Sequence, residues 1–137
     1  MKFFLTFFTF LVLLSCNLAH YPGLGSSPTA NSAGESEREF NELMKTYKPP
    51  TEEALNDLLN ENSDSTKTTV MFRNASSCNI VLTVSGNGYL EKIPIPEGKL
   101  GYAVLKKGTY SLSSLVCRSI YRGTKTFTTA VTVTLKD

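Results

Sequence analysis

The sequence lacks the residues on which most metal sites and nucleophilic sites are built. It has no tryptophan, and its one histidine, His20, lies near the N-terminus. A serine or cysteine nucleophile needs a base within hydrogen-bond reach, which leaves only lysines and a few acids elsewhere in the chain. A zinc site on two cysteines needs further Cys or His ligands. We therefore expect no catalytic residue, no metal and no cofactor, and a protein that is not an enzyme.

The sequence also has no apolar run long enough for a permanent membrane span. The run at residues 3–14 covers 12 residues, whereas a helix needs about 20 to cross the hydrocarbon core. Lys2 before this run and Ser15 after it complete the pattern of a cleaved signal peptide over residues 1–15.

The end of this signal contains a lipidation motif. Leu13-Leu14-Ser15-Cys16 resembles the bacterial lipobox, in which the cysteine is acylated and becomes the first residue, although the second leucine departs from the commonest pattern. The alternative is an ordinary secretory signal cut nearby. One acyl chain anchors only marginally, so stable attachment takes at least two. We predict that Cys16 carries the lipid and anchors the protein in the outer membrane. We expect it to face the periplasm, because residues 17–21 lack the charged cluster that we associate with surface export.

Basic residues are scarce in the first half of the mature chain, and acidic residues are scarce in the second half. Residues 17–66 carry three basic and nine acidic residues, whereas residues 67–137 carry ten basic and three acidic. Either the acidic segment folds back on the basic domain, or the domain meets an anionic surface. The simpler alternative is two independently solvated surfaces. The exported location and the net charge of +2 argue against nucleic acid as a partner.

The first half of the mature chain is predicted to be a tether followed by two helices. Residues 16–34 are rich in Gly, Ser and Pro and too poor in large apolar residues to form a core, which indicates a flexible tether. Residues 35–61 contain two amphipathic helices separated by Pro49-Pro50, with Thr51 as a cap for the second. Their apolar stripes are Phe40, Leu43, Met44 and Tyr47, then Leu55, Leu58 and Leu59. These stripes either pack locally or bind a partner groove.

From residue 67 the pattern changes to strands. Alternating β-branched and aromatic residues are interrupted by turns at residues 86–88, 96–98 and 106–108. We predict strands at 68–74, 79–85, 89–95, 99–105, 109–117 and 125–135. Burial of Leu115 and Cys117 together with Tyr110 and Leu112 would require a bulge near Ser113-Ser114. Residues 67–137 are therefore predicted to form a small antiparallel β-sandwich, Ig-like or transthyretin-like.

Two cysteines lie in this domain. Export places Cys78 and Cys117 in a compartment where disulfides form. A disulfide closing a loop of about 40 residues stabilises a fold by about 4 kcal/mol in the chain-entropy model. A metal site and a reactive thiol are the weaker alternatives, so we predict a structural Cys78–Cys117 disulfide.

Tyrosines and acids are the remaining candidates for a site. Glycosidase chemistry needs two converging carboxylates, but Glu91 falls within a predicted strand and Glu97 within a turn, with Asp137 at the end of the chain. Tyrosines interleaved with basic residues could stack on a glycan, or they could be ordinary core and rim residues. They are Tyr89, Tyr102, Tyr110 and Tyr121, with Lys92, Lys99, Arg118 and Arg122.

Three stretches carry a family resemblance. Phe72-Arg73-Asn74-Ala75-Ser76-Ser77-Cys78-Asn79-Ile80, Ile93-Pro94-Ile95-Pro96 and the Leu105–Tyr110 and Leu115–Cys117 segments resemble an uncharacterised lipoprotein domain family of the Bacteroidota. The resemblance runs from about residue 40 to the C-terminus and implies a non-catalytic envelope protein. The Lys-Lys-Gly-Thr-Tyr turn also resembles that of PEGA-type and transthyretin-like surface sandwiches. Asp64-Ser65-Thr66 resembles the Bacteroidota O-glycosylation sequon, which makes Ser65 a candidate for modification.

These observations favour a non-enzymatic, membrane-anchored envelope lipoprotein that acts as a binding or structural module for a protein or glycan ligand. The alternative is an inhibitor or immunity lipoprotein directed against an envelope-targeting toxin or hydrolase.

Overall fold

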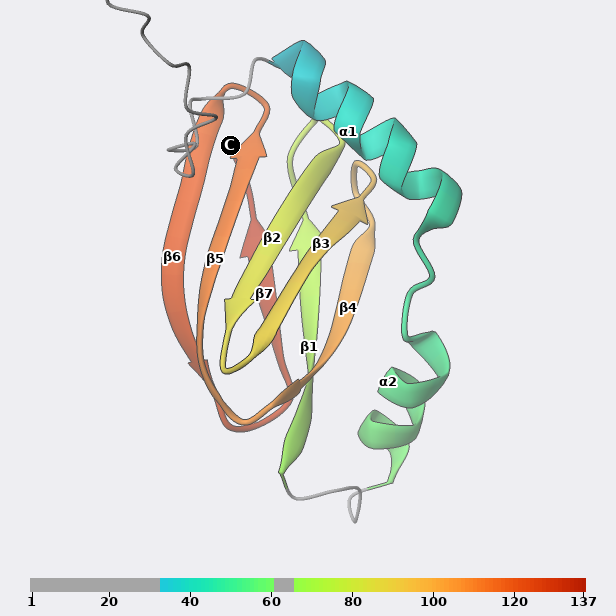
Figure 1. Ribbon diagram of the computed structural model, residues 1–137, viewed down its shortest axis with the longest axis vertical. Helices are drawn as coiled ribbons and strands as arrows, with labels where there is room; N and C mark the ends of the chain where they lie inside the picture. The colour runs from blue at the N-terminus through green and yellow to red at the C-terminus, as the bar shows by residue number, and fades with distance from the viewer. Residues whose placement is uncertain (1–32, 61–65) are drawn as a thin grey trace, which may run out of the picture.

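The computed structural model describes residues 33–60 and 66–137. Two helices, α1 (Ala33–Thr46) and α2 (Thr51–Leu59), precede seven strands (Figure 1). The strands are β1 (Lys67–Asn74), β2 (Ile80–Gly86), β3 (Tyr89–Ile95), β4 (Leu100–Lys106), β5 (Gly108–Val116), β6 (Ser119–Phe127) and β7 (Val131–Leu135).

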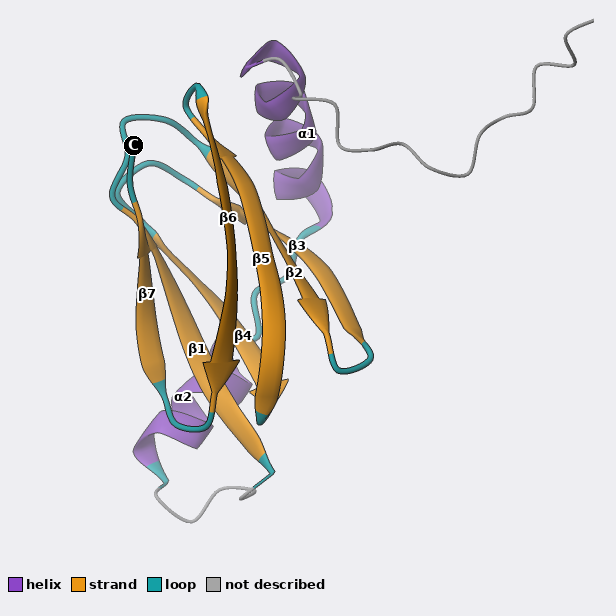
Figure 2. Cartoon of the chain, turned by 90° about the vertical axis from the view of Figure 1, so that its left-hand side faces the viewer, coloured by secondary structure: helices purple, strands orange, loops and turns teal. Residues whose placement is uncertain are grey.

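The strands form the two layers of a small β-sandwich, which confirms the predicted fold class. One sheet has the order β4-β1-β7 and the other the order β3-β2-β5-β6 (Figure 2). Neighbouring strands are antiparallel except for β1 and β7, which run parallel. The predicted turns are confirmed, and at the β2–β3 turn Asn87 and Gly88 have φ values of 51° and 76°, as a two-residue hairpin requires.

The core lies between the two sheets and follows the alternation read from the sequence. Successive side chains of a strand point to opposite faces, so β2 contributes Ile80, Leu82 and Val84 to the core, all of them fully buried. Tyr110 is buried as well, and its hydroxyl donates to the Lys106 carbonyl at 2.8 Å. Further fully buried core residues are Val70, Phe72, Ile93, Ile95, Leu105, Leu112, Val116 and Leu135.

The predicted strand at 125–135 is wrong, because the chain turns inside it. β6 begins at Ser119 and ends at Phe127, and β7 begins at Val131. Residues 119–124 of β6 were not predicted to form a strand, because both faces of this segment are largely polar. Phe127 is the one fully buried side chain of β6. Phe127 and Val131 therefore belong to different sheets.

The predicted bulge in β5 is also wrong. β5 pairs with β6 in unbroken register from Gly108 to Val116. Ser114 takes the inward position between Leu112 and Val116, and its hydroxyl donates to the Val81 carbonyl at 2.9 Å. A buried hydroxyl with a backbone partner removes the need to turn Leu115 inward.

Both helices pack on the sandwich at the side of β3 and β4 (Figure 1). α1 contacts β2 and β3 and buries Phe40, and α2 contacts β4 and β1. The predicted apolar stripe of α2 does not face the sandwich, because Leu55, Leu58 and Leu59 are 50%, 36% and 78% exposed.

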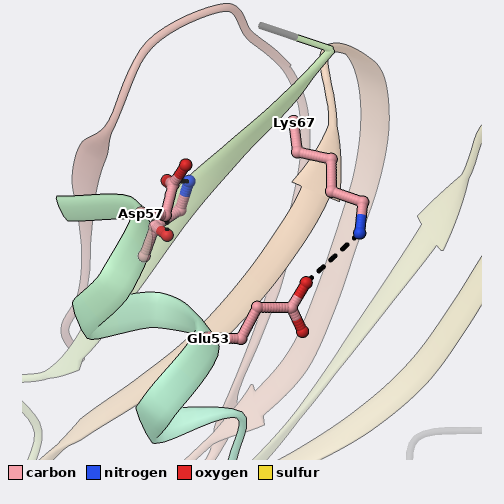
Figure 3. A network of polar contacts seen from close by, with 4 residues as sticks. Glu53, Asp57 and Lys67 are labelled. Atoms are coloured by element: carbon pink, nitrogen blue, oxygen red, sulfur yellow. Dashed lines mark hydrogen bonds and ion pairs between the residues drawn. The ribbon is translucent and has the colours of Figure 1, made fainter. Parts of the chain in front are cut away.

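α2 is attached by polar contacts and by Ala54, which is 1% exposed. The Asp57 carboxylate accepts from the Thr69 backbone N–H at 2.8 Å and from its hydroxyl at 2.7 Å. Lys67 and Glu53 form an ion pair at 3.2 Å beside it (Figure 3). The Thr51 cap is wrong as well, since Pro50 holds the cap position and makes no side-chain hydrogen bond there.

Candidate functional site

The predicted lipidation and glycosylation residues, Cys16 and Ser65, lie outside the described residues, as does His20. The two domain cysteines lie within them. Cys78 and Cys117 are joined by a disulfide with a Cα–Cα distance of 5.6 Å, which lies in the usual range. It connects the loop after β1 to the β5–β6 turn, where Cys117 has a φ of 55°.

Asn74 organises the loop that carries Cys78. Its side chain is fully buried, and its amide donates to the carbonyls of Cys78 at 2.8 Å, Ile95 at 3.0 Å and Pro96 at 3.2 Å. Its Oδ1 accepts from the Ser76 N–H and hydroxyl. Sequence reasoning missed this residue, although Asn two positions before a serine is typical of an Asx-turn.

A cavity of about 320 Å³ lies between the disulfide and the start of α1. Its lining includes Ser36, Glu37 and Arg118, and the Asn79 amide donates to Glu37 at 3.1 Å. Cys78, Cys117 and Ala33, the first described residue, all line this cavity. The hydrogen bond between Asn79 and Glu37 at this cavity helps to hold α1 on the sandwich.

Tyr47 closes the sandwich at the edge formed by β3 and β4. It packs against the core from the segment between the helices, and its hydroxyl reaches the Tyr102 carbonyl at 3.5 Å. Burial and the nearby Glu91 carboxylate raise the pKa of Tyr47 to about 12. Tyr89 donates to Glu91, and burial followed by that hydrogen bond raises the pKa of Tyr89 well above its ordinary value. Both phenols therefore stay protonated at neutral pH.

The tyrosines considered for glycan stacking form no common exposed surface, although the rings of Tyr89 and Tyr110 are in edge-to-face contact at 6.3 Å. Tyr110 is in the core, Tyr89 and Tyr102 lie at the β3–β4 edge, and Tyr121 lies on β6 at the other side of the sandwich. The acids are equally dispersed. Glu91 is on β3, Glu97 in the β3–β4 turn and Asp137 at the C-terminus.

The opposite edge of the sandwich, between β6 and β7, holds a groove of about 500 Å³. Its lining residues are Tyr121, Lys125, Thr126, Phe127, Val131, Thr132, Val133 and Thr134. Both helices lie away from this edge, and β6 and β7 are the edge strands of their sheets. We call it the β6–β7 groove. The sequence did not reveal Tyr121 and Lys125 as neighbours in one strand, because no strand was predicted over residues 119–124.

The acidic helices lie on the basic sandwich. Glu39 of α1 pairs with Lys92, and Glu53 of α2 pairs with Lys67. These are the two ion pairs found among residues 33–60 and 66–137, so most of the ten basic residues of the sandwich stay without an acidic partner there.

Residues 33–60 and 66–137 lack two further features. No cluster of His, Cys, Asp and Glu suited to a metal ion occurs within them. No helix within them is long and apolar enough to cross a membrane.

Residues 42–137 match the family described as a domain of unknown function (DUF6759). The chain belongs to this family. The DUF6759 match begins within α1 and includes α2 and the whole sandwich. This agrees with the resemblance to an uncharacterised family that the sequence showed from about residue 40 to the C-terminus. The lipoprotein character and the PEGA-type resemblance stay predictions. None of the curated proteins compared with the chain matches it.

Three solved structures match part of the chain with low scores. A DUF3823 family protein from Parabacteroides merdae is 16% identical with a TM-score of 0.42, and one from Bacteroides ovatus is 12% identical with a TM-score of 0.40. The TIE protein of Bacillus anthracis is 13% identical with a TM-score of 0.41. The matches cover 53%, 51% and 52% of this DUF6759 chain, and it spans 46%, 43% and 16% of those chains, respectively.

Proposed function

We propose that this chain is a lipid-anchored envelope protein that works as a non-enzymatic binding module. The observation that carries the binding role is the β6–β7 groove. It exposes apolar and cationic side chains at an edge that neither helix covers. The anchor rests on the signal and lipobox-like segment that ends at Cys16.

The order of segments fits a module held off a membrane. α1 begins at Ala33, and an extended chain spans at most about 3.3–3.6 Å per residue. Residues 17–32 could therefore separate the fold from a lipid on Cys16 by some tens of ångströms. That reach leaves the sides of the sandwich accessible to another envelope component.

The arrangement of ionisable groups supports a non-enzymatic role. General acid–base chemistry needs a proton donor or acceptor whose pKa lies near the working pH. The half-buried Tyr89–Glu91 pair has a phenol whose pKa is raised away from that range. The other acids of the sandwich, Glu97 and Asp137, lie on separate segments.

The anchor is tested by intact mass and fractionation of the full chain expressed in a bacterium of the Bacteroidota. We expect wild type to start at Cys16, to carry acyl chains and to stay with membranes, and Cys16→Ala to lose the acyl mass and leave the membrane fraction. An unlipidated wild-type chain that keeps residues 1–15 would contradict the anchor.

The binding role is tested by cross-linking in the native envelope. We expect a discrete cross-linked partner for wild type, lost when Tyr121→Asp places a charge in the β6–β7 groove and kept with Ser111→Asp, a change at an exposed β5 position. Thermal unfolding of both variants controls for folding. The binding role is refuted if wild type cross-links to no envelope component and a deletion strain has an unchanged envelope.

A further inference from the structure

We propose that the β6–β7 groove binds an extended, acidic segment of a partner protein, which adds to the free edge of β7 as a further strand. This proposal rests on the binding role above and specifies the chemical class of the partner. It is carried by the orientation of the β7 backbone, the apolar floor of the groove and the charge of its rim.

The backbone of β7 presents hydrogen-bonding groups to the groove. Among the described strands β7 pairs with β1 alone, and the Leu135 carbonyl points to β1, because it accepts from the Ala75 N–H at 2.8 Å. The polar backbone groups of a strand alternate between its two sides. The N–H and C=O groups of Thr132 and Thr134 therefore point to the free side, and both residues line the groove.

The floor of the groove suits the side chains of an extended strand. Phe127 and Val133 are 2% and 7% exposed, while Val131 is 39% exposed and Tyr121 is half-buried against the core. A Cβ added at Gly123 would lie 3.2 Å from the Tyr121 hydroxyl, so the tyrosine extends over that glycine along β6. Every second side chain of an added strand would point to this floor.

The rim favours an acidic occupant. Lys125 lies opposite Tyr110 in the β5–β6 register and so points to the inner side of the sheet. It is exposed there, and the lining of the groove contains no acid. Lys106 and Lys107 lie at the same end, directly before Gly108, which pairs with Phe127. An inward-pointing charge at a sheet edge discourages pairing with an identical edge, so charge favours an acidic segment over a second copy of this chain.

The test uses the full chain in detergent and a fluorescent heptapeptide, Val-Thr-Glu-Thr-Val-Thr-Val, which places valines and a glutamate on the same face of a strand. We expect saturable binding by fluorescence anisotropy, weakened about 5-fold by Lys125→Glu, because one exposed ion pair contributes up to about 1 kcal/mol and the change also replaces attraction by repulsion. Lys99→Glu is the matched control. It reverses an exposed lysine in the β3–β4 turn and should leave the affinity unchanged within about 2-fold.

The backbone part of the proposal has its own variant. Thr132→Pro removes an N–H that points to the free side and leaves the ladder to β1 intact, whereas Thr132→Ala keeps that N–H. We expect a loss of about 2- to 12-fold for the proline variant alone, the range of one net hydrogen bond. Amide exchange by NMR should show Thr132 and Thr134 slowed by the peptide in wild type.

Three results would overturn the proposal. Equal binding of a backbone N-methylated peptide would mean that charge alone acts, as for an anionic polymer. Equal binding of the same peptide with lysine in place of glutamate would remove the acidic preference. Protection of Thr132 and Thr134 that grows with protein concentration and without peptide would identify a second copy as the occupant. The anchor and cross-linking tests above do not depend on these peptides, so failure here and failure of the proposed function are distinguishable.

Discussion

Replacing Asn74 by alanine should destabilise the whole sandwich, although Asn74 lies at the end of a strand. The side chain is fully buried, and its amide and Oδ1 together hold the Cys78 loop and the end of β3. Asn74→Ala would leave the carbonyls of Cys78 and Ile95 and the N–H of Ser76 without these partners. Burial keeps water from replacing them easily.

The magnitude follows from the number of bonds. Four hydrogen bonds of 3.1 Å or less join Asn74 to Cys78, Ile95 and Ser76. At about 1 kcal/mol net for each bond, the free energy of unfolding should fall by about 4 kcal/mol. Domains of this kind have about 5–15 kcal/mol in total, so this loss is a large share of the stability.

Guanidinium unfolding of the oxidised protein measures this loss. With a slope of about 2 kcal/mol per molar, the midpoint should fall by about 2 M at unchanged slope. Ser76→Ala is the matched control, because it removes the hydroxyl alone and should cost about 1 kcal/mol. Asn74→Asp keeps an acceptor but places a buried carboxylate oxygen against the carbonyls of Cys78 and Ile95, so it should cost at least as much as Asn74→Ala. If Asn74→Ala costs no more than Ser76→Ala, the assignment of Asn74 as the organiser of this loop is wrong.

Three further predictions concern the core, the disulfide and alkaline pH. Gly101→Ala should cost about 1–3 kcal/mol of unfolding free energy, because its Cβ would lie 2.8 Å from Ile95; Gly34→Ala, which meets nothing within 4 Å, is the thermal-melt control. Replacing both disulfide cysteines, which are 39 residues apart, by serine should cost about 4 kcal/mol, measured by chemical unfolding; an unchanged midpoint would contradict it. The folded pKa of Tyr47 is raised from 10.0 to about 12, so its contribution to stability is complete below pH 10 and is lost as the pH rises to 12. Tyr47→Phe should flatten the loss of stability between pH 10 and 12, and a profile equal to that of wild type would contradict the shift.

The sequence predicts those parts of the fold in which each position has a single environment, either the core, the solvent or a tight turn, and a residue type suited to it. β2 alternates cleanly because one of its faces lies in the core, and the turn at residues 86–88 needs the positive φ that Asn and Gly adopt readily. The pairing of Cys78 with Cys117 was predicted because the domain contains two cysteines and no other ligand for them. In these cases local chemistry and global packing agree.

β6 could not be predicted in this way, and the β6–β7 groove depends on it. Its inward positions include Lys125, Gly123 and Tyr121, which form no apolar alternation, because this part of the strand lies at an open edge of the sandwich. Whether a strand lies at an uncovered edge depends on the order of strands in the sheets, which the sequence of that strand does not encode by itself. The polar sequence of β6 is therefore typical of a strand at an exposed edge, although from sequence alone it resembles a loop.

α2 shows the opposite error, in which a clear apolar pattern does not mark the packed face. The two hydrogen bonds from Thr69 to Asp57 fix the rotation of the helix about its axis. With Asp57 facing β1, the small Ala54, three positions earlier, faces the sandwich on the same side. Leu55 and Leu59 then lie on a neighbouring strip of the helix surface that points away. A carboxylate that accepts two hydrogen bonds from a buried threonine determines this orientation, whereas the hydrophobic periodicity alone would have turned the leucines inward.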